Sequence, residues 1–297
     1  MSRRPNTTIA KRSSNFLLAC VMLATLSASV MAQQVTKPDV SRQPAALYKT
    51  AGSPQYAVLN INNITSWMRY DGQSNHSPGA DDGAYYPRGT GSVIYQDGLV
   101  WGGKAFLDAA HTVPGPRQLI RVGGGTYGIG TRAGRILNPF LGPAVGTGVE
   151  DPNAADVRVF RIRRDYDSMS EVDYTRDAAS VNEISESSVT PSQIATVRAQ
   201  YAADWTSWPV AKGAPFIDRN GNGIFDPPPP FSPMFSVDSL VSGGYDEPGV
   251  SGADMSLPAD QVIFTVYNDL NVDKALYFAS SEPMGLEVQK TMWGYRR

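Results

Sequence analysis

Cysteine is almost absent from this chain: Cys20 is the only one among 297 residues, and it lies in the first 32. Without those 32 residues the chain has no disulfide, no thiol nucleophile and no cysteine ligand for a metal. The two histidines, His76 and His111, belong to no zinc-ligand pair, and no Gly-x-Ser-x-Gly elbow is present. The glycine-rich segment 123–130 lacks the Lys-Ser/Thr of a phosphate-binding loop, so we expect no nucleotide.

Long apolar runs and an excess of positive charge are also missing. After Phe16–Ala28, no apolar run approaches the ~20 residues that span a bilayer, so we expect no transmembrane segment after signal removal. Four of the 26 Lys and Arg lie in the first 32 residues, and the remaining Lys and Arg are outnumbered by the 28 Asp and Glu. With no basic cluster beyond Arg161, Arg163 and Arg164, the sequence argues against a nucleic-acid partner.

The N-terminus has the order of an export signal. Residues 1–15 are polar and basic, Phe16–Ala28 is apolar, and residues 30–32 end on a small side chain. A basic segment, a short apolar segment and small residues before a cleavage site are typical of a signal peptide. We therefore predict that residues 1–32 are removed and that the protein is secreted or lies on the outer cell surface, with the periplasm as the alternative. The apolar stretch before Cys20 is too short for a lipoprotein signal.

The remaining chain divides into a polar leader, residues 33–55, and a β-rich extracellular region, residues 56–297. The clearest hairpin signal is the Asp97-Gly98 pair between the apolar runs Ser92–Tyr95 and Leu99–Trp101, because such a pair suits a tight turn. Further strands are predicted at residues 118–122, 155–163, 261–267 and 286–295.

One segment predicts a helix. Thr190 can cap it, Pro191 suits its first position, and Gln193 completes a capping box. Many short strands, 28 Gly, 22 Pro and this single helix predict a mainly β fold. We expect an antiparallel, sandwich-like arrangement with one short helix and long Gly/Pro-rich loops.

The sharpest motif is Asp-Arg-Asn-Gly-Asn-Gly-Ile-Phe-Asp at residues 218–226. Calcium takes about six to eight oxygen ligands, and a loop of this spacing supplies them from positions 1, 3, 5, 7 and 9, with glycine at position 6. The predicted ligands are Asp218, Asn220, Asn222, the Ile224 carbonyl and Asp226. The usual glutamate at position 12 is missing, so Asp260, or Asp246 with Glu247, must complete the site. The alternative is an Asn-Gly turn between strands.

A second hypothesis is a secreted hydrolase that acts on polysaccharide. Sugar hydrolysis needs two carboxylates on opposite sides of a bond, and an acidic stretch could supply them. Its members are Asp165, Asp167, Glu171, Asp173 and Asp177. Trp205, Trp208 and Trp293 could stack on sugars, although most are expected in the core. The simpler interpretation of the acidic stretch is a solvated loop.

Several motifs resemble the N-terminal region of large secreted and surface proteins of bacteria that use type IX secretion. They are Asn60–Ile64, Tyr86–Gly89, Asp97–Lys104, Trp208–Asp218, Asn268–Leu270 and Met292–Tyr295, so the resemblance covers most of residues 56–297. That family signature has no assigned activity, so the resemblance implies location and architecture but no catalytic residues. Such proteins usually continue well beyond this region, so the resemblance implies that the present chain is a fragment, the product of a truncated gene or a stand-alone copy.

Together, these features predict a non-catalytic, calcium-stabilised β-rich module of an exported protein, with a glycan or a surface protein as the partner. The secreted hydrolase is the alternative.

Overall fold

The computed structural model describes residues 54–79, 83–115, 118–126, 128–227, 244–251 and 257–296. The predicted signal peptide and nearly all of the predicted leader lie outside these ranges. No helix in the described part of the chain is both long enough and apolar enough to cross a membrane.

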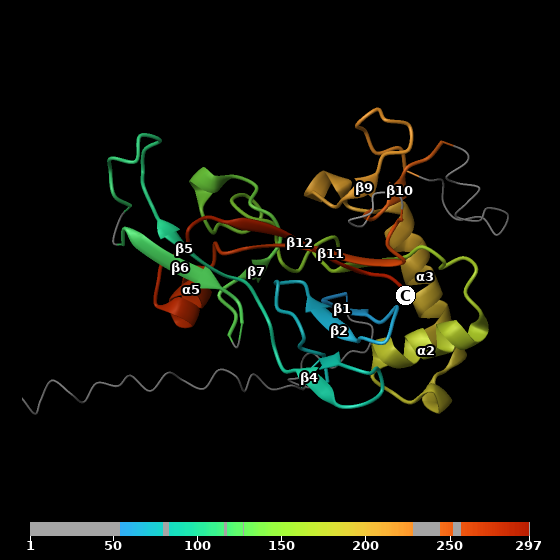
Figure 1. The fold of residues 1–297 in the computed structure, drawn as a ribbon. Helices are drawn as coiled ribbons and strands as arrows, with labels where there is room; N and C mark the ends of the chain where they lie inside the picture. The colour runs from blue at the N-terminus through green and yellow to red at the C-terminus, as the bar shows by residue number, and fades with distance from the viewer. Residues whose placement is uncertain are drawn as a thin grey trace, which may run out of the picture. The chain divides into compact units, whose positions relative to one another are not determined.

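The main sheet is built around one long buried strand, β11 (Gln261–Asn268). Its eight residues all pair with β12 (Glu287–Gly294). Its other edge pairs first with β8 (Phe160–Arg163) and then with β7 (Arg132–Ala133). All three pairings are antiparallel, and Figure 1 shows β11 and β12 running together through the molecule.

The described chain also contains four smaller two-stranded sheets, and all are antiparallel. They pair β1 (Tyr56–Leu59) with β2 (Ser66–Arg69), β3 (Ala84–Tyr85) with β4 (Ser92–Ile94), β5 (Val100–Lys104) with β6 (Ile120–Gly124), and β9 (Phe216–Ile217) with β10 (Glu247–Pro248).

Three α-helices complete the described fold: α2 (Glu171–Asn182), α3 (Pro191–Thr206) and α5 (Val272–Ala279). The predicted capping box of α3 is confirmed, because Thr190 and Gln193 exchange hydrogen bonds between side chain and backbone. Ser170 caps α2 and Asn271 caps α5 in the same manner, through N–H groups three residues on. Short 3₁₀ turns lie at Pro139–Leu141, Glu186–Ser188 and Val210–Lys212.

The core lies on both faces of β11. On one face, Val262, Phe264 and Val266 pack with aromatic side chains of α2, α3 and the following turn, among them Trp205 and Trp208. On the other face, Ile263 packs with a smaller cluster from the β1–β2 hairpin. Alternate side chains of a strand point to opposite faces, which explains why one strand serves two clusters.

The expectation of an antiparallel, mainly β chain is confirmed, but the expectation of one helix is wrong. Helices α2 and α3, rather than a second sheet, cover one face of β11, so the sandwich-like arrangement is not confirmed. The segment interpreted as an acidic loop is partly helix α2. Its apolar residues Tyr174, Ala178 and Val181 follow helical spacing, and all three contribute to the core.

The hairpin predicted at Asp97-Gly98 is also wrong. Strand β4 pairs with β3, and β5 pairs with β6, so the two runs flanking the dipeptide do not pair with each other. A Cβ on Gly98 would lie 1.7 Å from the carbonyl oxygen of Gly125. Glycine is therefore required here for a close approach to another segment, not for the positive φ of a tight turn.

Candidate functional site

The predicted calcium loop begins directly after β9 and returns to the fold through β10. The pairing places Ile217 opposite Glu247, so Asp218 and Asp246 both emerge at the same end of this small sheet. Gly221 and Gly223 have φ angles of 74°, a region that glycine enters without strain, and a Cβ at either would meet nothing within 4 Å. The local sequence therefore produces a tight, exposed coil.

Asp218 organises the first half of the loop. Its two carboxylate oxygens accept hydrogen bonds from the N–H groups of Gly221 and Gly223, each at 2.7 Å. The Gly223 bond in particular, together with the Gly221 bond, holds the pKa of Asp218 below its usual range. Asp218 is therefore charged at neutral pH, as a carboxylate ligand of calcium must be.

The two asparagine side chains of the loop converge on Asp226. Its Oδ2 accepts hydrogen bonds from Nδ2 of Asn220 at 2.5 Å and from Nδ2 of Asn222 at 2.9 Å. The amide oxygens point the other way, toward the N–H groups of Asn222 and Ile224. The oxygen-rich donor set suits a hard cation. Calcium would need both amides to rotate so that their oxygens face the ion beside the Asp226 carboxylate.

Asp246 closes the base of the loop and is buried. Its Oδ1 accepts the N–H of Arg219 and its Oδ2 accepts the N–H of Asp226, both at 2.8 Å. Glu247, also buried, pairs with Arg219 at 2.5 Å and with Arg164 next to β8. Asp246 thus connects the two ends of the loop to each other, and Glu247 connects the loop to Arg164 beside β8.

Of the carboxylates considered for completing the site, both Asp246 and Glu247 are hydrogen-bonded to the loop, Asp246 through backbone N–H groups and Glu247 through the side chain of Arg219. Asp260 instead accepts the N–H of Arg296 at 2.9 Å. No group of three or more His, Cys, Asp or Glu side chains is gathered around one point within the described ranges. Calcium at this loop would therefore depend on amide and backbone oxygens as well as on carboxylates.

The acidic stretch proposed for sugar hydrolysis is held in ion pairs. Asp177 is 1% exposed and binds Arg161 through two hydrogen bonds, at 2.6 and 2.9 Å. Glu171 pairs with Arg198 at 2.8 Å, and Asp165 pairs with Arg163 at 3.1 Å. Asp165, Glu171 and Asp177 thus bind arginines, while Asp173 and Asp177 also line a pocket that four arginines share.

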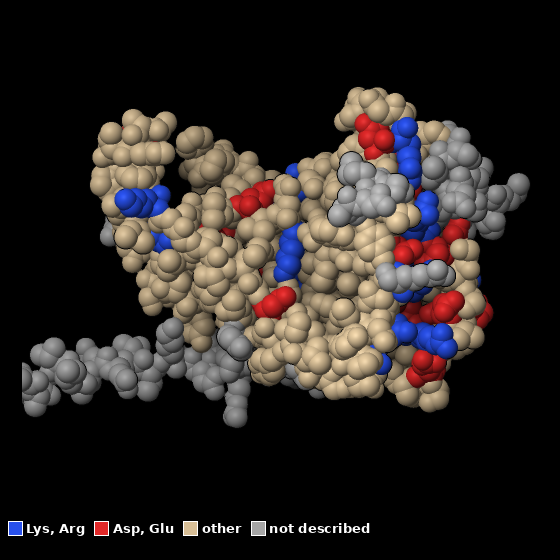
Figure 2. Space-filling view, viewed as in Figure 1, with Lys and Arg blue, Asp and Glu red and all other residues tan. Residues whose placement is uncertain are grey.

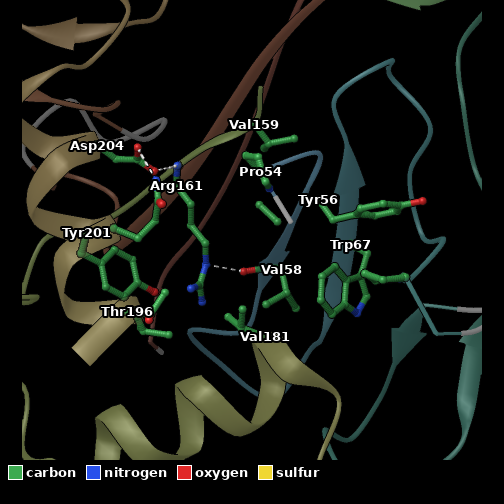
Figure 3. A pocket seen from close by; sticks show the side chains of 14 residues that line it. Pro54, Tyr56, Val58, Trp67, Val159, Arg161, Val181, Thr196, Tyr201 and Asp204 are labelled. Atoms are coloured by element: carbon green, nitrogen blue, oxygen red, sulfur yellow. Dashed lines mark hydrogen bonds between the residues drawn. The ribbon is translucent and has the colours of Figure 1, made fainter. Parts of the chain in front are cut away.

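Asp177 and Arg161 form the centre of a buried polar cluster that sequence reasoning missed. The hydroxyl of Tyr201 donates to Asp177, Asn60 both donates to Asp177 and accepts from Arg161, and the Val58 carbonyl accepts from Arg161 Nε. Figure 3 shows Arg161 reaching from β8 between Tyr201 and Val58. The cluster thus joins β1, β8, α2 and α3.

The protonation of Asp177 also argues against a role as the general acid. Burial raises the pKa of this carboxyl, but the charge and hydrogen bonds of Arg161 outweigh burial and leave the pKa below its ordinary value. A general acid for glycoside cleavage needs a raised pKa instead. Trp205 and Trp208, considered as sugar-stacking residues, are buried in the core, whereas Trp293 is half exposed.

An apolar crevice lies beside this cluster, where Tyr56 and Trp67 face Tyr201 and Asp204 (Figure 3). Its volume is about 70 Å³. Ligand pockets are usually ~300 Å³ or larger. The crevice therefore fits a few waters rather than a substrate.

Comparisons with known proteins assign no relative to the chain: no protein family, characterised protein or solved structure matches it.

Proposed function

We propose that the chain is a non-catalytic, calcium-stabilised β-rich module of an exported surface or extracellular protein. The observation that carries this proposal is the convergence of Asn220, Asn222 and Asp226 in a loop that Asp218 and Asp246 hold closed. The tripartite N-terminus supports export, and the resemblance to type IX secretion proteins supports a surface location. A glycan or a surface protein remains the expected partner.

Calcium would act by fixing the loop between β9 and β10. Because Glu247 ties the loop to Arg164 beside β8, ordering the loop would stabilise the contact between this small sheet and the main sheet. A loop without the position-12 glutamate should bind like a weak extracellular module, with a dissociation constant on the order of 10⁻⁴ to 10⁻³ M. Magnesium should substitute poorly, because it demands a smaller octahedral cage and keeps its waters.

The test is the melting temperature of the purified chain in 10 mM calcium and in chelator. If the dissociation constant is about 10⁻⁴ M, calcium adds about 2.7 kcal/mol of stability. That corresponds to a rise of about 5–10 °C for a domain of this size. Magnesium should give a much smaller rise.

Asp218→Ala should abolish the calcium response. Asp108→Ala is the matched control, because Asp108 is likewise a partly exposed aspartate that accepts loop N–H groups, those of Thr112 and Val113. It should keep the full response. If wild type and Asp218→Ala melt alike and neither responds to calcium, the loop is only a turn and the proposal is wrong.

A further inference from the structure

A second pocket, with a volume of about 310 Å³, lies where α2 meets the end of the chain. Its lining includes four arginines and only two carboxylates: Arg88, Arg163, Arg176, Arg296, Asp173 and Asp177. Figure 2 shows charged side chains gathered over this region of α2 and the C-terminal end of the chain. No aromatic side chain lines the pocket.

The charge of one of the two carboxylates, Asp177, is already neutralised by an arginine outside the pocket. Arg161, which lies outside the lining, binds Asp177 through both of its terminal nitrogens. Tyr201 and Asn60 donate to the same carboxylate. Asp177 therefore offers little negative charge to the interior of the pocket.

Two of the arginines are crowded together. Arg163 and Arg296 both pair with the one carboxylate of Asp165, and that pairing leaves one positive charge of the three groups uncompensated. Burial, followed by the charge of Arg163, lowers the pKa of Arg296. Like charges held this close favour an anion between them.

The other two arginines are weakly paired. Arg176 lies 3.8 Å from Asp173 and 3.7 Å from Glu186, and all three side chains are about half exposed. Arg88 donates to the Asn60 carbonyl at 2.7 Å and forms no ion pair with any residue in the described part of the chain. Its charge is therefore available to a ligand.

We propose that this pocket binds an oxyanion: a carboxylate, sulfate or phosphate group carried by a small acidic ligand such as an acidic sugar. The planar guanidinium fork recognises such groups through paired hydrogen bonds, which a lysine ammonium cannot do. The pocket volume is at the lower end of the range for small-molecule sites and fits about one sugar-sized unit. The inference goes beyond the proposed function and requires no calcium.

The test is a titration of the ¹⁵N-labelled full chain with inorganic sulfate, inorganic phosphate and glucuronate, observed at the arginine Nε–H signals. Sodium chloride at equal ionic strength is the reference. We expect saturable shifts at Arg163 and Arg296 with at least one of the three anions, with a dissociation constant of about 1 mM or lower. The anion that binds most tightly distinguishes a sulfate or phosphate ester from a uronic acid as the source of the group.

Arg88→Gln and Arg296→Gln should each weaken this binding about tenfold. Arg198→Gln is the matched control, because Arg198 is 50% exposed, as Arg296 is 48% exposed, but lies outside the pocket. It should bind like wild type. Arg88→Lys, which keeps the charge and loses the fork, should bind more weakly than wild type, and circular dichroism verifies that each variant is folded. Shifts no larger than those in chloride, or an equal loss in Arg198→Gln, would overturn the proposal.

Discussion

Two aspartates of this molecule, Asp177 and Asp218, are held charged by opposite means. Asp177 is buried, and its partners Arg161, Tyr201 and Asn60 come from distant parts of the chain. Asp218 is only partly buried, and its partners are N–H groups of Gly221 and Gly223 in its own loop. The pKa of both carboxyls lies below the ordinary value, because of Arg161 for one and backbone N–H groups for the other.

This difference in burial and partners assigns Asp177 to the stability of the fold and Asp218 to the response to calcium. A buried carboxylate with every hydrogen bond made can only hold elements together, because any ligand would first have to break those bonds. A partly exposed carboxylate that only shapes a loop can accept a cation from solvent. The comparison predicts that changes at Asp177 alter stability whether or not calcium is present, whereas changes at Asp218 alter the response to calcium.

The largest effect is expected from Asp177→Ala. This change leaves the buried Arg161 without its carboxylate, and breaking a buried pair in this manner costs about 3–5 kcal/mol. Urea unfolding should show the loss equally in calcium and in chelator. Glu171→Ala, at the exposed start of the same helix, is the control and should cost about 0–1 kcal/mol. Equal losses in the two variants would contradict a special role for the buried pair.

The same carboxyl should make the protein sensitive to acid. Because the pKa of Asp177 is lower in the folded than in the unfolded state, its contribution is present above the unfolded pKa of about 3.9 and is lost as the pH falls below it. Unfolding monitored from pH 6 to pH 2 should show this decline. In Asp177→Ala the decline should be shallower, and an unchanged slope would argue that other groups dominate.

Glu247→Gln should have the next largest effect, because Glu247 connects the Asp218 loop to Arg164 beside β8. It is 1% exposed and pairs with both Arg164 and Arg219. Removing its charge should cost about 2–4 kcal/mol and should also weaken the calcium response, since Arg219 belongs to the loop. Glu186→Gln, an exposed glutamate 3.7 Å from Arg176, is the control and should change stability by less than about 1 kcal/mol. A full calcium response in Glu247→Gln would show that the loop acts independently of the core.

The smallest effect is expected at the start of α3. Thr190→Ala removes the capping box and should cost about 1 kcal/mol in urea unfolding. Thr196→Ala lies inside the same helix and should be neutral or stabilising, because alanine favours a helix interior. A loss at Thr196 as large as that at Thr190 would mean that the cap contributes nothing of its own.

The contrast between Asp177 and Asp218 also explains how much could be predicted from the sequence. The cap of α3, the strands β11 and β12 and the coil of the Asp218 loop depend on residues within a few positions of one another, and the sequence predicted each. The Arg161–Asp177 cluster and the hydrogen bonds of Asp246 join residues that are far apart in the sequence. No local pattern predicts which of these residues will be in contact. The prediction of a hairpin at Asp97-Gly98 was wrong for the same reason, because β5 pairs with β6 and not with the neighbouring run.

The most direct test of the central claim is nuclear magnetic resonance of the loop amides during a calcium titration. We predict saturable shifts of the Gly221 and Gly223 N–H signals and of the side-chain amides of Asn220 and Asn222, as the two amides rotate toward the ion. Signals of the Arg161–Asp177 cluster should stay in place. Loop signals that do not move in 10 mM calcium would contradict the claim that this loop binds calcium.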